Sequence, residues 1–288
     1  MTLAVVLVLA LFVGVALGAL GGGGSILTVP ILVYVADLEP KQAIATSLLV
    51  VGVTSCVGAV THARAGRIRW RTGTLFGTGG MAGALVGGIL GGLVPGRLLL
   101  VGFAVMMIAT SAAMLRGGAA LQPAEDVKVV RAVVDGIGVG LITGLVGAGG
   151  GFLVVPALAL LGGLSMPTAI GTSLVVIALK SGAGLAGYLT SVSIPWGLAT
   201  AVLAAAILGS VVGGRITGAV DEDRLRNMFG WFVLTIGTFM LLEQAAPSSW
   251  LLPGAVVLAL GVVAVGGWRW SVARSGVRAP RRLARKPG

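Results

Sequence analysis

A glycine-rich stretch of ten residues, Gly21–Pro30, returns 126 positions later as Gly147–Pro156, with the proline still in register. When residues 21–50 are aligned with residues 147–176 without a gap, 14 of the 30 positions are identical. An internal repeat strongly limits the architectures open to a chain, and this period is far too long for a solenoid. The sequence therefore predicts two folded halves that share one structural plan.

Composition indicates which solvent surrounds these halves. The chain is 57% hydrophobic and 10% charged, whereas soluble domains carry about 25% charged residues. Several apolar runs approach or reach the ~20 residues that a membrane-spanning helix needs. They cover residues 5–20, 75–94, 98–115, 199–212 and 250–265. Because lipid offers the backbone no hydrogen-bond partner, these runs should be α-helical, and we expect an all-α polytopic protein in a lipid bilayer.

The glycine-rich stretches should break helices inside the membrane. We expect a first helix over residues 2–20 and a break at the glycines, because each glycine costs about 1 kcal/mol relative to alanine in a helix. Ser25 is the expected N-cap of a short helix over residues 26–36. About a dozen residues at 1.5 Å each reach only ~18 Å, whereas the hydrocarbon core is about 30 Å thick. The short helix must therefore begin inside the membrane.

The remaining segments complete two repeats of this plan. Further helices are predicted at residues 42–61, 72–94, 97–115, 132–146, 152–161, 167–189, 196–220 and 225–243. The expected organisation is a first repeat at 1–115, a cytoplasmic linker at 116–131, a second repeat at 132–245, an extra transmembrane helix at 246–270 and a basic cytoplasmic tail at 271–288.

Small residues spaced four apart recur in both halves. Gly83 and Gly87 correspond to Gly209 and Gly213. Such spacing lets two helices approach closely in a membrane. We expect these glycines to serve helix packing within the protein, and the alternative is a dimer interface.

Charged loops set the predicted orientation. Residues 64–71 hold four arginines, whereas the equivalent loop in the second half, residues 190–195, has no charge. Because positively charged loops stay in the cytoplasm, the two loops should face opposite sides, and the two repeats should be inverted. We expect five crossings per half, an external N-terminus and a cytoplasmic C-terminus in a bacterial inner membrane. A parallel arrangement of four plus four crossings is the alternative.

Several functional classes lack their sequence signatures. The net charge of +11 comes from basic residues that flank apolar spans, which favours membrane topology over nucleic-acid binding. Neither glycine-rich stretch fits the nucleotide-binding patterns, and no catalytic set or group of metal ligands is evident. We therefore expect no enzyme, no cofactor, no metal and no nucleic-acid partner.

Glycine-interrupted segments at matching positions of two halves are the best sequence indicator of a transporter's binding site. A helix that begins near mid-membrane directs free N–H groups and about half a positive charge toward its N-terminus, which favours a small anion. The residues expected to form one shared site are Gly23, Gly24, Ser25, Gly149, Gly150 and Gly151. The alternative is that the glycines only let helices cross tightly.

Two ionisable residues extend this hypothesis. Lys180 lies in an otherwise apolar helix, where a charge is costly and by default faces a functional cavity. We expect it to be a fixed positive charge for the substrate; the alternative is a lysine that pairs with a carboxylate or extends to the membrane surface. Asp135 is the candidate partner of Lys180 or the carrier of a coupling proton. Interfacial placement is its alternative.

Hydroxyl groups recur early in two long helices. Thr46 and Ser47 in the first half correspond to Thr172 and Ser173 in the second. Their hydroxyls can donate hydrogen bonds to a bound oxyanion, and equally they can bond the helix backbone. We include all four among the expected substrate-binding residues.

Together these motifs resemble a known family. The two glycine-rich stretches ending in Val-Pro, the Ala-Ile-x-Thr-Ser-Leu segments at 43–48 and 169–174, and the later Trp70 and Trp196 look like the TauE/SafE sulfite exporter family of bacterial membrane permeases. The resemblance implies a secondary transporter that exports small sulfur-containing anions such as sulfite or sulfonates, coupled to protons or another ion. An uncoupled anion channel and a transporter of a small carboxylate are the alternatives. The segment from Trp250 onward departs from the family's pattern.

Overall fold

The computed structural model describes residues 2–20, 25–115, 129–147, 151, 154–155, 158, 164, 166–216 and 222–245. This part of the chain is helical and contains no strand, which confirms the expected all-α membrane fold. The predicted extra helix at 246–270, the tail and most of the linker lie outside the described residues. Most of the short helix expected at 152–161 also lies outside them.

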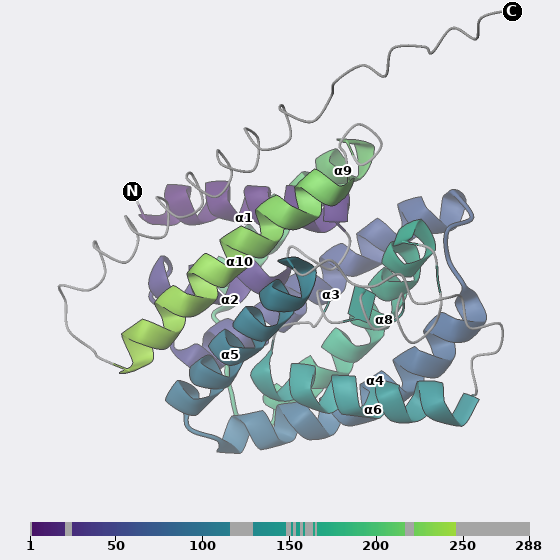
Figure 1. Cartoon of the computed structure of the whole chain (residues 1–288). Coiled ribbons are helices and arrows are strands. Elements are labelled where there is room, and N and C mark those ends of the chain that lie inside the picture. Colours follow the sequence, from purple (N-terminus) through teal and green to yellow (C-terminus); the bar gives the residue numbers. More distant parts are fainter. Residues whose placement is uncertain are drawn as a thin grey trace, which may run out of the picture.

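Four helices of the first half have a described counterpart in the second half, in the same order along the chain (Figure 1). The first half contains α1 (Thr2–Leu20), α2 (Thr28–Tyr34), α3 (Pro40–Arg64), α4 (Trp70–Leu93) and α5 (Gly96–Leu115). The second contains α6 (Val129–Val146), α8 (Met166–Tyr188), α9 (Trp196–Ile216) and α10 (Glu222–Ala245). Among the described residues, four helices are long and apolar enough to cross a membrane: α3, α4, α8 over Thr168–Tyr188, and α9 over Trp196–Gly213.

Helix starts differ from the sequence prediction by up to three residues, among them those of α2 and α3. Residues 25–27 form a 3₁₀ turn and α2 begins only at Thr28. Leu27, not Ser25, therefore holds the N-cap position, and it makes no side-chain cap bond. The next helix, α3, begins at Pro40 rather than at residue 42, because proline has no N–H to lose in the first turn and its φ already suits a helix.

Helices of one half pack mainly on helices of the other half. In the described part, α1 packs on α9, and the equivalent pair is α6 on α4. The pair α3 and α9 likewise corresponds to α8 and α4, while α3 contacts α8 and α5 contacts α10. Exchanging the halves therefore exchanges each contact with its counterpart. Figure 1 shows α4 beside α6 along the lower edge of the molecule.

The equivalence extends to single atoms at the glycines spaced four apart. A Cβ on Gly83 would collide with the Ile137 carbonyl, and a Cβ on Gly209 would collide with the Leu11 carbonyl, its repeat counterpart. Gly87 and Gly213 meet the carbonyls of another equivalent pair, Leu141 and Val15. The glycines thus permit backbone contact between helices of the same chain, which confirms the helix-packing interpretation.

The long helices α3 and α8 cross at the centre of this arrangement. A Cβ on Gly52 would lie 3.3 Å from Ser181 Cβ, and a Cβ on Gly58 would lie 3.3 Å from Leu174 Cδ1. At the other end, a Cβ on Gly184 would lie 3.5 Å from Leu48 Cδ1. Residue numbers rise along α3 as they fall along α8, so the two helices run antiparallel.

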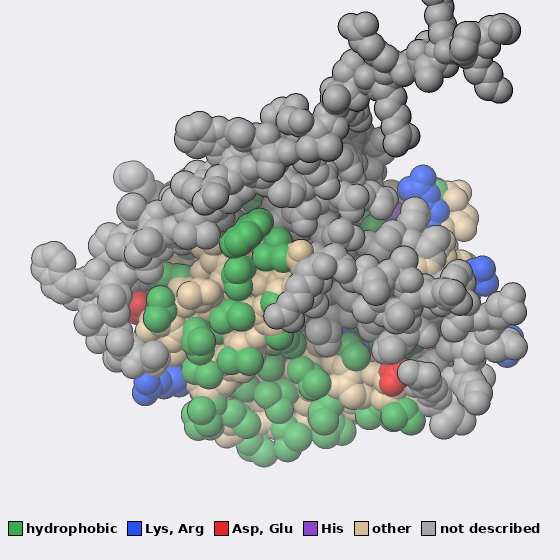
Figure 2. Space-filling view, in the orientation of Figure 1, with side chains coloured by type: hydrophobic (Ala, Val, Ile, Leu, Met, Phe, Trp, Pro, Cys, Tyr) green, Lys and Arg blue, Asp and Glu red, His purple; other side chains and the backbone are tan. Residues whose placement is uncertain are grey.

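The outer surface suits lipid. Figure 2 shows hydrophobic side chains over the lower face, where α4, α5 and α6 lie, and lysine and arginine side chains at its margins. Exposed apolar residues on these three helices include Leu85, Ile89, Leu93, Leu98, Val105, Val134, Ile137 and Ile142. Large apolar residues exposed side by side indicate a face that contacts an apolar medium.

Candidate anion site

Lys180 is fully buried in α8, with only 1% of its surface exposed. Its Nζ donates a hydrogen bond to the hydroxyl of Thr143 on α6, at 3.1 Å. Among the described residues this hydroxyl is its one hydrogen-bond partner, and no carboxylate forms an ion pair with it. The hydroxyl of Thr143 in turn donates to the Val139 carbonyl at 2.7 Å. The charge is thus held in place by a neutral group.

Two glycines lie where the lysine stem passes α4 and α6. A Cβ on Gly80 of α4 would lie 3.8 Å from Lys180 Cβ and 3.7 Å from the Gly136 carbonyl oxygen. A Cβ on Gly136 would come within 3.2 Å of the Gly80 nitrogen and would meet the Phe76 carbonyl. The backbones of α4 and α6 therefore lie close together where the lysine stem passes.

The second glycine stretch begins one helical turn from Thr143. Gly147 has a positive φ of 74°, a conformation that glycine adopts without strain. Its N–H donates to the Thr143 carbonyl at 2.9 Å, and a Cβ on it would collide with Ile44 of α3. The second break therefore lies against the first half, next to the residue that holds Lys180.

The hydroxyls of Thr46 and Ser47 lie in the next turn of α3 after Ile44. Both residues are fully buried, and neither hydroxyl has a hydrogen-bond partner among the described residues. Leu48 follows them and lies against Gly184, one turn beyond Lys180 on α8. This turn of α3 and the lysine therefore approach the same end of α6.

Thr172 and Ser173 lie at the other end of the crossing. Thr172 Oγ1 accepts a hydrogen bond from the Arg69 N–H at 3.0 Å, and Ser173 Oγ donates to the Ile170 carbonyl at 2.7 Å. Twelve residues of α8 separate Thr172 from Gly184, the neighbour of Leu48, which is ~18 Å of helix. The structure does not bring the two Thr-Ser pairs together.

The other residues expected at the site are only partly described. Gly23, Gly24, Gly149 and Gly150 lie outside the described residues. Ser25 and Gly151 are both buried. Asp135 is half-buried on α6, eight residues before Thr143, which corresponds to ~12 Å along the helix. The hydrogen bond of Lys180 goes to Thr143, not to Asp135.

Comparison with known proteins decides the family. The model of the sulfite exporter TauE/SafE family matches residues 6–240. The chain belongs to this family. The match covers both repeats from α1 to α10, and it confirms the resemblance carried by the two glycine-rich stretches.

Relatives of this TauE/SafE protein carry general names. A probable membrane transporter protein of Xylella fastidiosa is 32% identical over 243 residues, covering 80% of this chain and 91% of its own. Similar proteins also named probable membrane transporters occur in Bacillus subtilis (27% identical, 74% and 90% covered) and Methanocaldococcus jannaschii (29%, 81% and 95%). No solved structure matches the chain. The TauE/SafE protein is therefore a multi-pass membrane transporter.

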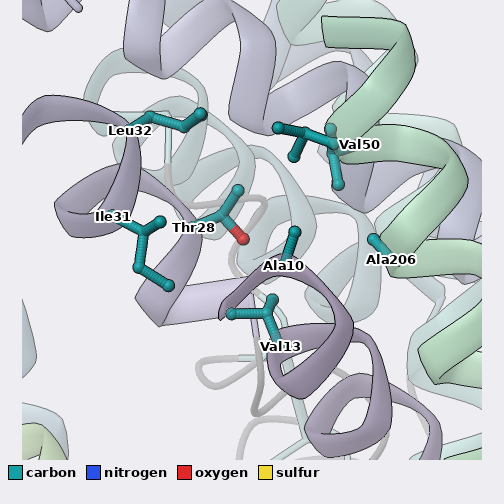
Figure 3. A pocket seen from close by; sticks show the side chains of 8 residues that line it. Ala10, Val13, Thr28, Ile31, Leu32, Val50 and Ala206 are labelled. Atoms are coloured by element: carbon teal, nitrogen blue, oxygen red, sulfur yellow. The ribbon is translucent and has the colours of Figure 1, made fainter. Parts of the chain in front are cut away.

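A cavity between helices of both halves of the TauE/SafE fold is a poor anion site. It lies between α1, α2, α3 and α9 (Figure 3). Its lining is Ala10, Val13, Thr28, Ile31, Leu32, Val50, Val202 and Ala206. The one polar side chain, Thr28, points its hydroxyl into the cavity and has no hydrogen-bond partner in the described part of the chain. No positive charge lines it, so it offers an anion little.

Sequence reasoning missed three residues near the α3 and α8 crossing. Ser55 and Ser181 are repeat equivalents, both fully buried, and their hydroxyls have no partner among the described residues. Their identity at the repeat offset of 126 was a readable signal. The sequence held no comparable signal for Thr143, because its counterpart in the first half is Leu17.

Proposed function

We propose that this transporter exports small sulfur-containing anions such as sulfite or sulfonates as a secondary transporter. The observation that carries the proposal is the fully buried Lys180, whose only described hydrogen-bond partner is the hydroxyl of Thr143. The family to which the chain belongs is described as a sulfite exporter family, and this supports sulfur as the central atom of the anion.

The physical argument concerns the missing counter-charge. A lysine in a membrane-spanning helix is costly, and such residues usually pair with another charge or face a cavity. A hydroxyl supplies one acceptor for an ammonium that has three donors. A bound anion would supply both the remaining acceptors and the opposite charge, so the site is more favourable when loaded.

Alternating access is the mechanism that we propose for export. The main contacts between the halves have counterparts when the halves are exchanged, an arrangement that suits two halves rocking about a central site. In this proposal the repeats are inverted in a bacterial inner membrane, with the N-terminus outside and the C-terminus inside. Asp135, half-buried on α6, is the proposed carrier of the coupling proton.

Transport assays test the function directly. The purified chain in proteoliposomes is given radiolabelled sulfite, a sulfonate, sulfate and a small carboxylate, with and without a pH gradient. Saturable sulfite or sulfonate flux that the gradient drives is the expected result. Flux that follows voltage alone would instead indicate an uncoupled channel, and preference for the carboxylate would move the proposal to a different substrate class.

Cysteine labelling tests the inversion. Cys56 is the only cysteine of the chain, so Cys56→Ala gives a background for Arg67→Cys and Val192→Cys. In whole cells, a membrane-impermeant maleimide should label the cysteine at 192 and leave the one at 67 unlabelled until the cells are opened. Labelling of both positions from one side would rule out inverted repeats.

A further inference from the structure

The repeat gives the fold two equivalent positions, one beside each glycine break. Among the described residues, a buried positive charge lies at only one of them. We propose that the sulfur oxyanion binds beside the second glycine break, between Lys180 of α8 and the Thr46–Ser47 turn of α3. The equivalent place in the first half then holds no ligand. This inference rests on the proposed function, and it narrows the site shared by both breaks that sequence symmetry predicts.

The positive charge occurs in one place only. Lys180 corresponds to Thr54, which is fully buried and donates its hydroxyl to the Val50 carbonyl of its own helix at 2.7 Å. Thr143, the hydrogen-bond partner of Lys180, corresponds to Leu17, a buried apolar residue. The first-half counterpart of the Lys180 and Thr143 pair therefore has no charge and no unused hydrogen-bond donor.

Two unused hydroxyls distinguish the Thr46–Ser47 turn from its repeat counterpart. Thr46 and Ser47 have no hydrogen-bond partner among the described residues. Their counterparts, Thr172 and Ser173, are bonded to the Arg69 N–H and the Ile170 carbonyl. Buried polar groups are nearly always hydrogen-bonded, so two adjacent unpartnered hydroxyls indicate a ligand that the protein itself does not supply.

A single substitution between the repeats explains the difference at Thr46. Arg69 corresponds to Pro195, and the backbone around both is alike: the Gly73 N–H donates to the Arg69 carbonyl at 2.9 Å, and the Ala199 N–H donates to the Pro195 carbonyl at 2.9 Å. Proline has no N–H. The bond that satisfies Thr172 therefore cannot form at Thr46, whose hydroxyl stays available.

Contacts between the two halves link the segments that carry these groups. Lys180 reaches Thr143, the N–H of Gly147 bonds the Thr143 carbonyl, and Gly147 lies against Ile44, one turn before Ser47. A Cβ on Gly184 would lie within 3.7 Å of both Leu48 and Gly144. An ammonium from one half and two hydroxyls from the other can all donate hydrogen bonds, which matches the three oxygens of sulfite.

Matched variants of the full-length chain test this assignment. Thr46→Val and Ser47→Ala are compared with Thr172→Val and Ser173→Ala, using equilibrium binding of radiolabelled sulfite and thermal unfolding without ligand. Because hydrogen bonds to charged groups are the strong ones, each α3 change should weaken sulfite binding about tenfold or more. The unfolding temperature of these two variants should stay the same or rise, because each change removes an unpartnered buried hydroxyl.

The second pair should respond with the opposite pattern. Thr172→Val leaves the Arg69 N–H without its acceptor, so the unfolding temperature should fall while sulfite affinity changes far less than in Thr46→Val. Equal losses of affinity in both pairs would overturn the one-sided assignment. The one-sided assignment would also be overturned if Thr46→Val left sulfite affinity unchanged and altered only how transport at saturating sulfite depends on sodium.

The same data separate this inference from the proposed function. If the wild-type chain neither binds nor transports any of the sulfur anions, the proposed function fails and the inference falls with it. If the wild type binds sulfite but Thr46→Val and Ser47→Ala bind it equally well, only the inference fails.

Discussion

The α4–α6–α8 region and its repeat counterpart, α9–α1–α3, share their backbone packing but differ in what they enclose. Gly83 and Gly209 meet equivalent carbonyls in the two regions. In the first region the stem of Lys180 passes beside Gly80. In the second region Ala206, the counterpart of Gly80, lines an apolar cavity. Backbone contacts determine how the helices pack in both regions. Side chains that do not disturb these contacts can differ between the regions and serve different functions.

The difference also separates structural glycines from functional side chains. At Gly83 and Gly87, and at their counterparts Gly209 and Gly213, two helix backbones touch and an added Cβ would meet a carbonyl, and both repeats retain glycine. At positions 54 and 180 one repeat carries threonine where the other carries lysine. We therefore expect this unlike pair to distinguish the two regions in anion binding.

The largest expected effect comes from removing the charge. Lys180→Met should weaken sulfite binding by roughly a hundredfold, because an anion would lose a charge-assisted hydrogen bond and its only counter-charge. The matched change Thr54→Val should leave affinity within about twofold, because that hydroxyl bonds only its own helix. Comparable losses in the two variants, measured by equilibrium binding, would remove the distinction between the regions.

Changes at the packing glycines should instead affect both regions alike. Gly83→Ala and Gly209→Ala each place a methyl group against a backbone carbonyl, and overpacking of this kind costs about 1–3 kcal/mol. Thermal unfolding of the purified variants should show similar losses of stability. If one variant unfolds like the wild type while the other is strongly destabilised, the packing of the two halves is not equivalent.

The smallest effect is expected in the apolar cavity. The counterpart of Thr28 is Val154, so Thr28→Val makes the first half resemble the second. It removes an unpartnered buried hydroxyl, which should leave stability unchanged or raise it by up to about 1 kcal/mol. Sulfite affinity should not change. A marked loss of affinity would place the cavity within the binding site.

Most helix positions could be predicted from the sequence. The apolar runs predicted the helices from α1 to α10 within a few residues, apart from the segment after the second break that is mostly undescribed, because lipid leaves the backbone few other structures. The start of α2 was wrong: the 3₁₀ turn at residues 25–27 delays the helix past Ser25. The pairing of α4 with α6, and of α9 with α1, depends on contacts between halves that local patterns do not encode.

The site was only partly readable for the same reason. Lys180 was visible as a charge within an apolar run. Its partner Thr143 lies 37 positions away on another helix, with no spacing or repeat that marks it. The four repeated hydroxyls looked equivalent, and the difference between Thr46 and Thr172 arises from Pro195 in place of an arginine on a neighbouring segment. Such differences require knowledge of which segments touch.

The most direct test of a single charged site is the number of sulfite ions bound per chain. Equilibrium dialysis of the purified full-length protein against radiolabelled sulfite, at concentrations well above saturation, gives this number without any assumption about transport. We predict one sulfite per chain in the wild type and in Thr54→Val, and clearly less than one in Lys180→Met at the same concentrations. Two ions per chain, or undiminished binding in Lys180→Met, would contradict this prediction.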